Sequence, residues 1–99
     1  MAIKDLTVLE KVKTALRIKS DAYNTEIQSL IAACKADLFI AGVESVDETD
    51  ALTAQAIIIY CKAHFGYDEN SEKFRQAYES LKMVMALARE YEEDVTEVV

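Results

Sequence analysis

Residues 55–70 of the chain read QAIIIYCKAHFGYDEN, and the way this stretch folds decides the fold class. Three consecutive isoleucines are typical of a β-strand. The apolar run, however, follows Thr49 and Asp50, which can cap a helix, and it opens with residues that are mostly strong helix formers. From that cap to Gly66 it extends over about fifteen residues, which is too long for a typical strand. The sequence therefore predicts a central core helix that is buried nearly all round.

Two further helices are predicted upstream of this stretch. Thr7 is followed three residues later by Glu10, a capping-box pattern that predicts a helix from about Thr7 to Arg17. The pair Ser20–Asp21 can cap the next helix, and apolar residues then recur at helical spacing. Gly42 is predicted to end this second helix, at a position where a residue in the left-handed conformation is wanted.

A last helix is predicted to begin at Asn70 or Ser71, with an apolar stripe that runs through Val84. A second apolar flank lies outside this stripe and contains Met83 and Leu87. Either the short first helix covers this flank, or the flank makes an intermolecular contact, and both alternatives stay open at this point.

Helices joined by short connections predict an all-α fold, a compact bundle of about four helices. The 99 residues fit one domain. We expect this domain to span residues 1–92 and to be followed by an acidic, flexible tail at residues 93–99. The residues predicted to form the core are Leu16, Ile27, Leu30, Ile31, Cys34, Leu38, Ile57, Ile58, Tyr60, Cys61, Phe74, Tyr78 and Leu81.

Composition argues against several classes of protein. The formal net charge is −7, whereas binding of a phosphate backbone requires clustered Lys and Arg. The charged N-terminal sequence lacks the apolar core of a signal peptide. The longest uncharged run, residues 51–61, falls far short of the roughly 20 residues that cross a bilayer. Two cysteines within apolar sequence indicate reduced thiols in a cytoplasmic protein.

The residue types that commonly catalyse reactions or bind metals do not form a pattern in this sequence that predicts a catalytic or metal site. His64 is the only histidine, so neither a metal site with several histidines nor a Ser-His triad can be built. Cys61 lies one helical turn earlier and could mimic a Cys–His pair. The simpler interpretation is that Cys61 faces the core while His64 sits near the negative end of the helix dipole. We therefore predict no enzyme and no catalytic, metal-binding or cofactor-binding residues.

Interface candidates are better defined than catalytic ones. Tyr67 and Tyr91 lie near predicted helix ends, where tyrosines can act as binding hot spots. Together with Met83, Ala86 and Leu87 of the second flank, they are the predicted contacts with other subunits or partners.

The order of these features resembles that of the tailed-phage head-tail connector family, also called head-completion adaptor proteins. Members begin with a short Leu-rich helix and an LRI-like segment, followed by an Asp-led turn and a helix that ends at glycine. The matching residues here are Leu16, Arg17, Ile18, Asp21, Ile27, Leu30, Ile31, Ala32, Ala33 and Gly42. Those that fit the two closing helices are Ala51, Ala54, Ile57, Tyr60, His64, Phe65, Gly66, Phe74, Ala77, Tyr78, Leu81 and Leu87. The resemblance spans about residues 6–91.

The resemblance implies a structural role without substrate turnover. Such proteins form a ring, about twelve-fold, beneath the portal of a DNA-filled head. The implied partners are further copies of the chain, the portal protein and the next head-completion or tail protein. DNA would pass through the ring without sequence-specific binding. The implied location is the head-tail junction of the virion, after synthesis in the bacterial host cytoplasm. The alternative reading of the residues is a small acidic helical module for protein–protein interaction, such as a regulator or an anti-repressor.

Overall fold

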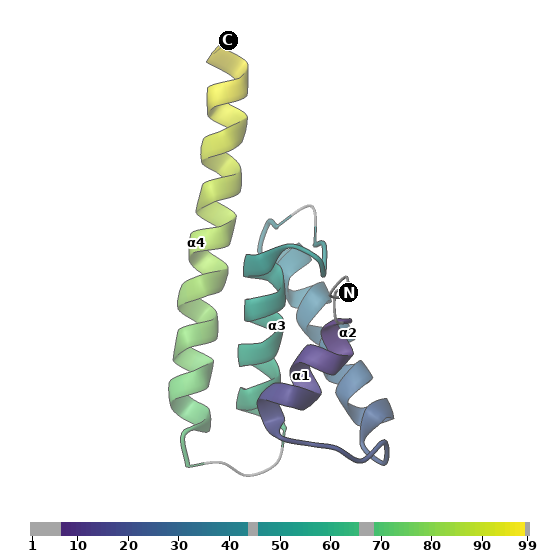
Figure 1. Ribbon diagram of the computed structural model, residues 1–99. Helices are drawn as coiled ribbons and strands as arrows, with labels where there is room; N and C mark the ends of the chain where they lie inside the picture. The colour runs from purple at the N-terminus through teal and green to yellow at the C-terminus, as the bar shows by residue number, and fades with distance from the viewer. Residues whose placement is uncertain (1–6, 44–45, 66–68, 99) are drawn as a thin grey trace.

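The computed structural model describes residues 7–43, 46–65 and 69–98, of which residues 89–98 are described as backbone only. Within these residues the chain forms four α-helices and no strand, as Figure 1 shows. The helices are α1 (Val8–Leu16), α2 (Asn24–Ile40), α3 (Ala51–His64) and α4 (Ser71–Val98). The predicted all-α bundle is therefore confirmed.

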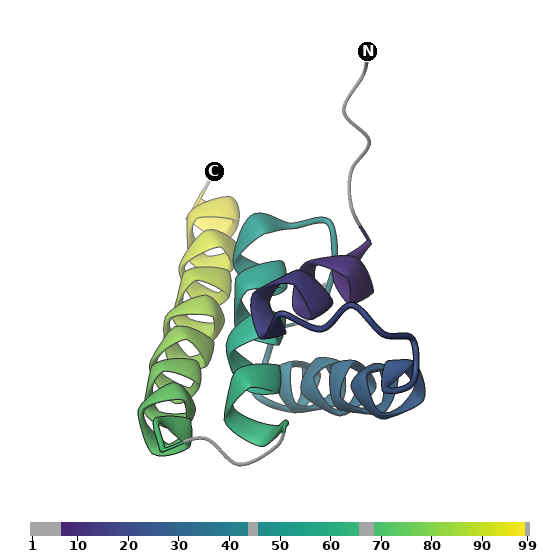
Figure 2. The same ribbon diagram turned by 60° about the horizontal axis from the view of Figure 1, so that its bottom comes forward.

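The stretch with three isoleucines forms α3, the helix that contacts all the others. The Asp50 carboxylate caps its first turn by accepting hydrogen bonds from the Thr53 backbone N–H at 3.0 Å and the Thr53 hydroxyl at 3.2 Å. Ile57 is fully buried, whereas Leu52 near the start of α3 is exposed. In Figures 1 and 2, α1 and α4 lie on opposite sides of α3. A helix surrounded in this way can bury apolar side chains on most of its faces.

The two ends of α1 show why it is so short. The Thr7 hydroxyl accepts a hydrogen bond from the Glu10 N–H, and the Thr7 N–H donates to the Glu10 carboxylate, which confirms the capping box. At the other end, Arg17 adopts the left-handed conformation, with φ 61° and ψ 40°. The N–H of Ile18 then donates to the carbonyl of Lys13, so the helix is closed by a Schellman motif.

The start of α2 differs from the prediction. The pair Ser20–Asp21 lies in the turn before the helix, which begins at Asn24. The Ser20 hydroxyl accepts from the N–H of Ala22, and the Asp21 carboxylate forms a 2.7 Å ion pair with Lys13 of α1. The ion pair holds this turn against α1, and the N-cap of α2 is Tyr23, so the predicted cap is wrong by two or three residues.

The end of α2 follows the prediction closely. Gly42 has a positive φ of 111°, a conformation that side chains rarely adopt. The N–H of Val43 donates to the carbonyl of Leu38 at 3.0 Å, and the N–H of Gly42 donates to Phe39 at 3.1 Å. These two bonds make a Schellman motif, and the buried Val43 side chain completes it.

The core lies around α3. Seven of the residues expected there are buried: Ile27, Ile31, Cys34, Leu38, Ile57, Cys61 and Tyr78. A second set is partly buried against them: Leu16, Leu30, Ile58, Tyr60 and Leu81. Phe74 is also partly buried. The core additionally contains residues outside the expected set, namely Val8, Val12, Val43, Ala56 and Met85.

The backbone of residues 93–98 continues α4 as helix. The division into a domain at residues 1–92 and a flexible tail at residues 93–99 stays a prediction. None of the helices described is long and apolar enough to cross a membrane.

Candidate functional site

The single histidine and its neighbouring cysteine do not form a reactive pair. Cys61 is fully buried and His64 is exposed, with its ring against that of Tyr60 at 4.3 Å between centroids. Burial raises the pKa of the Cys61 thiol to about 12, so the thiol stays protonated at neutral pH. Cys61 therefore acts as a core residue. Nowhere in the described part of the chain do three or more metal-ligating side chains gather.

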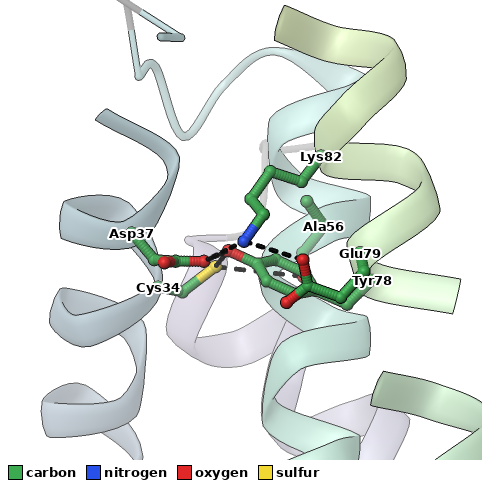
Figure 3. Close-up of polar contacts among 6 residues, drawn as sticks. All are labelled: Cys34, Asp37, Ala56, Tyr78, Glu79 and Lys82. Carbon is green, nitrogen blue, oxygen red and sulfur yellow. Dashed lines mark hydrogen bonds and ion pairs between the residues drawn. The ribbon is translucent and has the colours of Figure 1, made fainter. Parts of the chain in front are cut away.

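A polar cluster instead joins α2 to α4, as Figure 3 shows. The buried Tyr78 hydroxyl donates to the Asp37 carboxylate at 2.7 Å, and the Lys82 ammonium donates to the same oxygen at 2.9 Å. Lys82 also pairs with Glu79 at 2.9 Å. The Tyr78 hydrogen bond and the nearby Lys82 charge hold the pKa of Asp37 below its usual value. The cluster fixes α4 against α2 at a defined position.

The thiol of Cys34 completes this cluster on its buried side. Its sulfur lies 3.8 Å from the Tyr78 hydroxyl and 4.0 Å from the carbonyl of Ala56. Burial raises the pKa of Cys34 to about 11. Our sequence analysis placed Cys34 and Tyr78 in the core but missed Asp37. The signal was available, because Asp37 lies one turn after Cys34 and thus shares the apolar face of α2.

A groove of about 650 Å³ lies beside this cluster, between α2, α3 and α4. Three of the residues that line it are alanines: Ala33 and Ala36 of α2 and Ala63 of α3. Ile40, which also lines it, is 80% exposed. Small apolar residues let another chain approach closely, so this α2–α4 groove is a candidate docking surface.

The outer face of α4 carries a second apolar surface, which we call the α4 stripe: Met83, Val84 and Leu87. Their side chains are 63%, 56% and 58% exposed. At about 100° per residue, the α4 stripe lies on the side of the helix opposite Tyr78 and Met85, which are buried. Val84 was expected within the buried stripe, and that expectation is wrong.

Cover by the first helix does not explain this flank. The main contacts of α1 are with α2 and α3, and α1 lies across α3 from α4 in both Figure 1 and Figure 2, while Met83 and Leu87 are exposed. Of the two alternatives for the flank, cover by α1 is therefore wrong, and an intermolecular contact remains. Among the other predicted interface residues, Ala86 is partly buried and lies near Gly42, which follows α2. Tyr67 and the side chain of Tyr91 fall outside the described residues.

A smaller groove of about 250 Å³ lies at the end of the bundle where α1 and α3 finish and α4 begins. We call it the basic groove. Ala15, Leu16, Arg17, Lys62, Phe65 and Phe74 line it. The Lys62 ammonium lies 5.4 Å from the centre of the Phe74 ring, a cation–π contact. Sequence analysis missed this groove, because its residues come from three segments far apart along the chain.

Comparison with protein-family models assigns the chain to a family. A family model described as phage connector protein matches residues 8–92, which covers the whole bundle and most of α4. Comparisons with curated proteins and with solved structures gave no match. The match confirms the resemblance to head-tail connector proteins that the order of sequence features indicated. The chain belongs to the phage connector protein family.

Proposed function

We propose that this chain is a structural adaptor of a tailed phage, which forms a ring under the portal, extends the DNA channel and joins head to tail. Its family makes it a component of the phage virion that interacts with other head or tail proteins. The ring, its place beneath the portal and the absence of catalysis belong to our proposal. One observation carries it: a single subunit presents two different apolar surfaces.

These two surfaces lie on different sides of the subunit. The residues of α4 that line the α2–α4 groove are Arg75, Tyr78 and Glu79. The α4 stripe begins at Met83 and, at about 100° per residue, faces away from Tyr78. A neighbour's stripe can therefore occupy the groove while the subunit's own stripe stays free for the next copy. Contacts of this heterologous kind close into a ring when the rotation between subunits allows it.

The shapes and chemistry of the two surfaces also suit each other. Met83 and Leu87 are long, flexible side chains that project from α4, whereas Ala33, Ala36 and Ala63 leave space in the groove. Methionine adapts to irregular surfaces, which suits a subunit that must contact more than one neighbour. Burial of a large apolar side chain contributes about 1.5–3 kcal/mol, so a few such contacts can support a weak interface in each subunit.

The charge of the chain fits a DNA conduit. With a net charge of −7, a ring of many copies would carry a strongly negative field. Such a field repels phosphates and would let the duplex slide rather than adhere to the channel wall. The proposal therefore includes passage of DNA without sequence-specific binding.

The direct test is genetic and visual. We would delete the reading frame from the phage genome, induce the phage and examine the lysate by electron microscopy. Complementation would use the wild-type chain, the double variant Met83→Glu/Leu87→Glu, or the control Gln28→Glu, which changes an exposed residue of α2. We expect separate tails beside empty or leaking heads for the deletion and the double variant. Wild type and control should restore virions.

Circular dichroism of the double variant provides the necessary control for folding. Both substituted side chains are exposed, so the variant should keep its helix content. Intact infectious virions in normal numbers from the deletion would contradict the adaptor proposal. Normal virions from the double variant alone would contradict the α4 stripe as the subunit contact.

A further inference from the structure

We propose that the basic groove binds the acidic C-terminal segment, residues 90–98, of a neighbouring copy of the chain. This inference rests on the proposed function, because it requires several copies side by side. It adds a second, electrostatic contact to the apolar one between the α4 stripe and the α2–α4 groove.

The first support is the charge of the groove. Arg17 and Lys62 place two cations at its edge in a chain whose net charge is −7. Among the described residues neither one forms an ion pair. This holds although Glu69 lies just before α4 and Glu72 lies in its first turn, close in sequence to Phe74. Two cations beside aromatic rings, without a carboxylate partner among the described residues, form a surface that attracts a negatively charged, partly apolar segment.

Three other lysines of the chain already form ion pairs with carboxylates. Lys13 pairs with Asp21, Lys35 with Glu48 and Lys82 with Asp37. Lys62 is held differently, because its ammonium lies over the Phe74 ring and so stays at the groove. In the part of the chain that the structure describes, the basic groove thus keeps positive charge that no carboxylate neutralises, and an incoming acidic segment can bind there.

The backbone of Arg17 gives an independent reason to assign a role to its side chain. Arg17 ends α1 in the left-handed conformation, which glycine adopts without steric cost and which other residues rarely occupy. Strain of this kind is concentrated at functional sites. Arg17 is exposed and lines the groove, on a backbone fixed by the Schellman motif of α1.

The occupant follows from charge and from geometry. Residues 90–98 contain five carboxylates and no basic side chain, and they include Tyr91 and Val95, apolar residues that suit Phe65 and Phe74. In the same chain these residues lie at the far end of α4 from the groove, as Figure 1 shows. The 28 residues of α4 extend about 42 Å, so the segment cannot reach its own groove. It can reach only that of another copy.

The test measures binding of a fluorescent peptide with the sequence of residues 89–99 to the full-length chain, by fluorescence anisotropy at low salt. We expect the double variant Arg17→Glu/Lys62→Glu to weaken binding about tenfold or more, because both cations are reversed. The control Lys19→Glu/Lys73→Glu makes the same change in net charge at exposed positions that do not line the groove. It should bind the peptide within about twofold of wild type.

Two further measurements separate specific binding from effects of misfolding and of peptide composition. Arg17→Gly should raise the unfolding midpoint and still weaken peptide binding, since it relieves the backbone while removing the guanidinium. A peptide of identical composition in scrambled order should bind less tightly than the native sequence. Equal affinity of the two double variants for the native peptide, or equal affinity of wild type for native and scrambled peptides, would overturn the proposal.

The outcome is distinguishable from that of the proposed function. Peptide binding is measured on the free chain and needs no ring, portal or virion. A failure here would leave the test of Met83 and Leu87 untouched, and a failure of that test would leave peptide binding as measured.

Discussion

Arg17 is the described residue whose backbone departs most clearly from what its side chain favours. A residue other than glycine in the left-handed region is disfavoured by about 1–2 kcal/mol. Glycine relieves this strain but loses more entropy on folding. We therefore expect Arg17→Gly to raise the free energy of unfolding by about 0.5–1 kcal/mol, measured by urea denaturation. Arg17→Ala keeps the strain and should give little gain. An equal gain for Gly and Ala would assign the effect to the side chain.

The hydrogen bond from Tyr78 to Asp37 leads to a second prediction, which concerns how the stability of the fold depends on pH. In the folded chain the pKa of Asp37 lies below its usual value of 3.8, chiefly because the Tyr78 hydroxyl donates to the carboxylate. The unfolded chain therefore takes up this proton more readily. The stabilisation is fully present above the unfolded pKa and is lost as the pH falls through the folded one.

The variant Tyr78→Phe should accordingly lose about 1 kcal/mol of unfolding free energy at pH 7. Since the Asp37 side chain is 38% exposed, solvent screening keeps the effect at this modest size. The difference from wild type should shrink below about pH 4, followed by urea denaturation at several pH values. Tyr23→Phe, at an exposed tyrosine, serves as the control. A difference that is constant from pH 7 to pH 3 would contradict the assignment to Asp37.

The helices show which parts of the fold can be predicted from local sequence. Asp50 and the capping box at Thr7 act within one turn of their own helix, so their patterns located α3 and α1 correctly. Gly42 ended α2 for the same local reason. The start of α2 was misplaced because the Asp21 carboxylate is engaged by Lys13, eight residues away on another helix. Helix propensity and local capping patterns cannot predict such a contact with another helix.

The candidate surfaces also differ in whether local sequence could predict them. Helical spacing along α4 was enough to single out Met83 and Leu87, because both lie on one continuous helix. Helical spacing also assigned Val84 to the buried stripe. The error arose because spacing alone does not show how much of the surface of α4 is covered by α3. The α2–α4 groove and the basic groove are each lined by residues of three helices. Such a hollow exists only once the angles between helices are known.

The C-terminal end of α2 supports a prediction for this element. A methyl group added at Gly42 would lie 4.0 Å from the Ala86 Cβ, an ordinary van der Waals distance, so space is available. The φ of 111° is nonetheless a conformation that side chains rarely adopt. We expect Gly42→Ala to lower the free energy of unfolding by about 1–2 kcal/mol in urea denaturation. Gly42→Asn should lose less, because asparagine tolerates such a cap better. A neutral Gly42→Ala would show that the backbone can relax.

At the scale of the whole molecule, the feature that matters is the mismatch between α3 and α4. The 14 residues of α3 extend about 21 Å, whereas the 28 residues of α4 extend about 42 Å. Since α3 is the central helix, the far half of α4 projects past the rest of the bundle in Figure 1. A helix that projects in this way places its end within reach of other subunits. This placement links the proposed domain at residues 1–92 with the proposed contact of the acidic segment.

Deletion of residues 93–99 tests both proposals in one molecule. It removes Glu93, Asp94 and Glu97, so the formal net charge falls in magnitude from −7 to −4. Because α3 packs against the first half of α4, we expect the free energy of unfolding to change by less than about 0.5 kcal/mol. Self-association at high protein concentration and low salt, followed by sedimentation velocity, should nevertheless weaken, since the basic groove loses three of the carboxylates it would bind. The reduced charge would by itself lessen repulsion between copies and favour association. Weaker association would therefore favour a specific contact, whereas stronger association or a loss of helical structure would contradict the proposed tail.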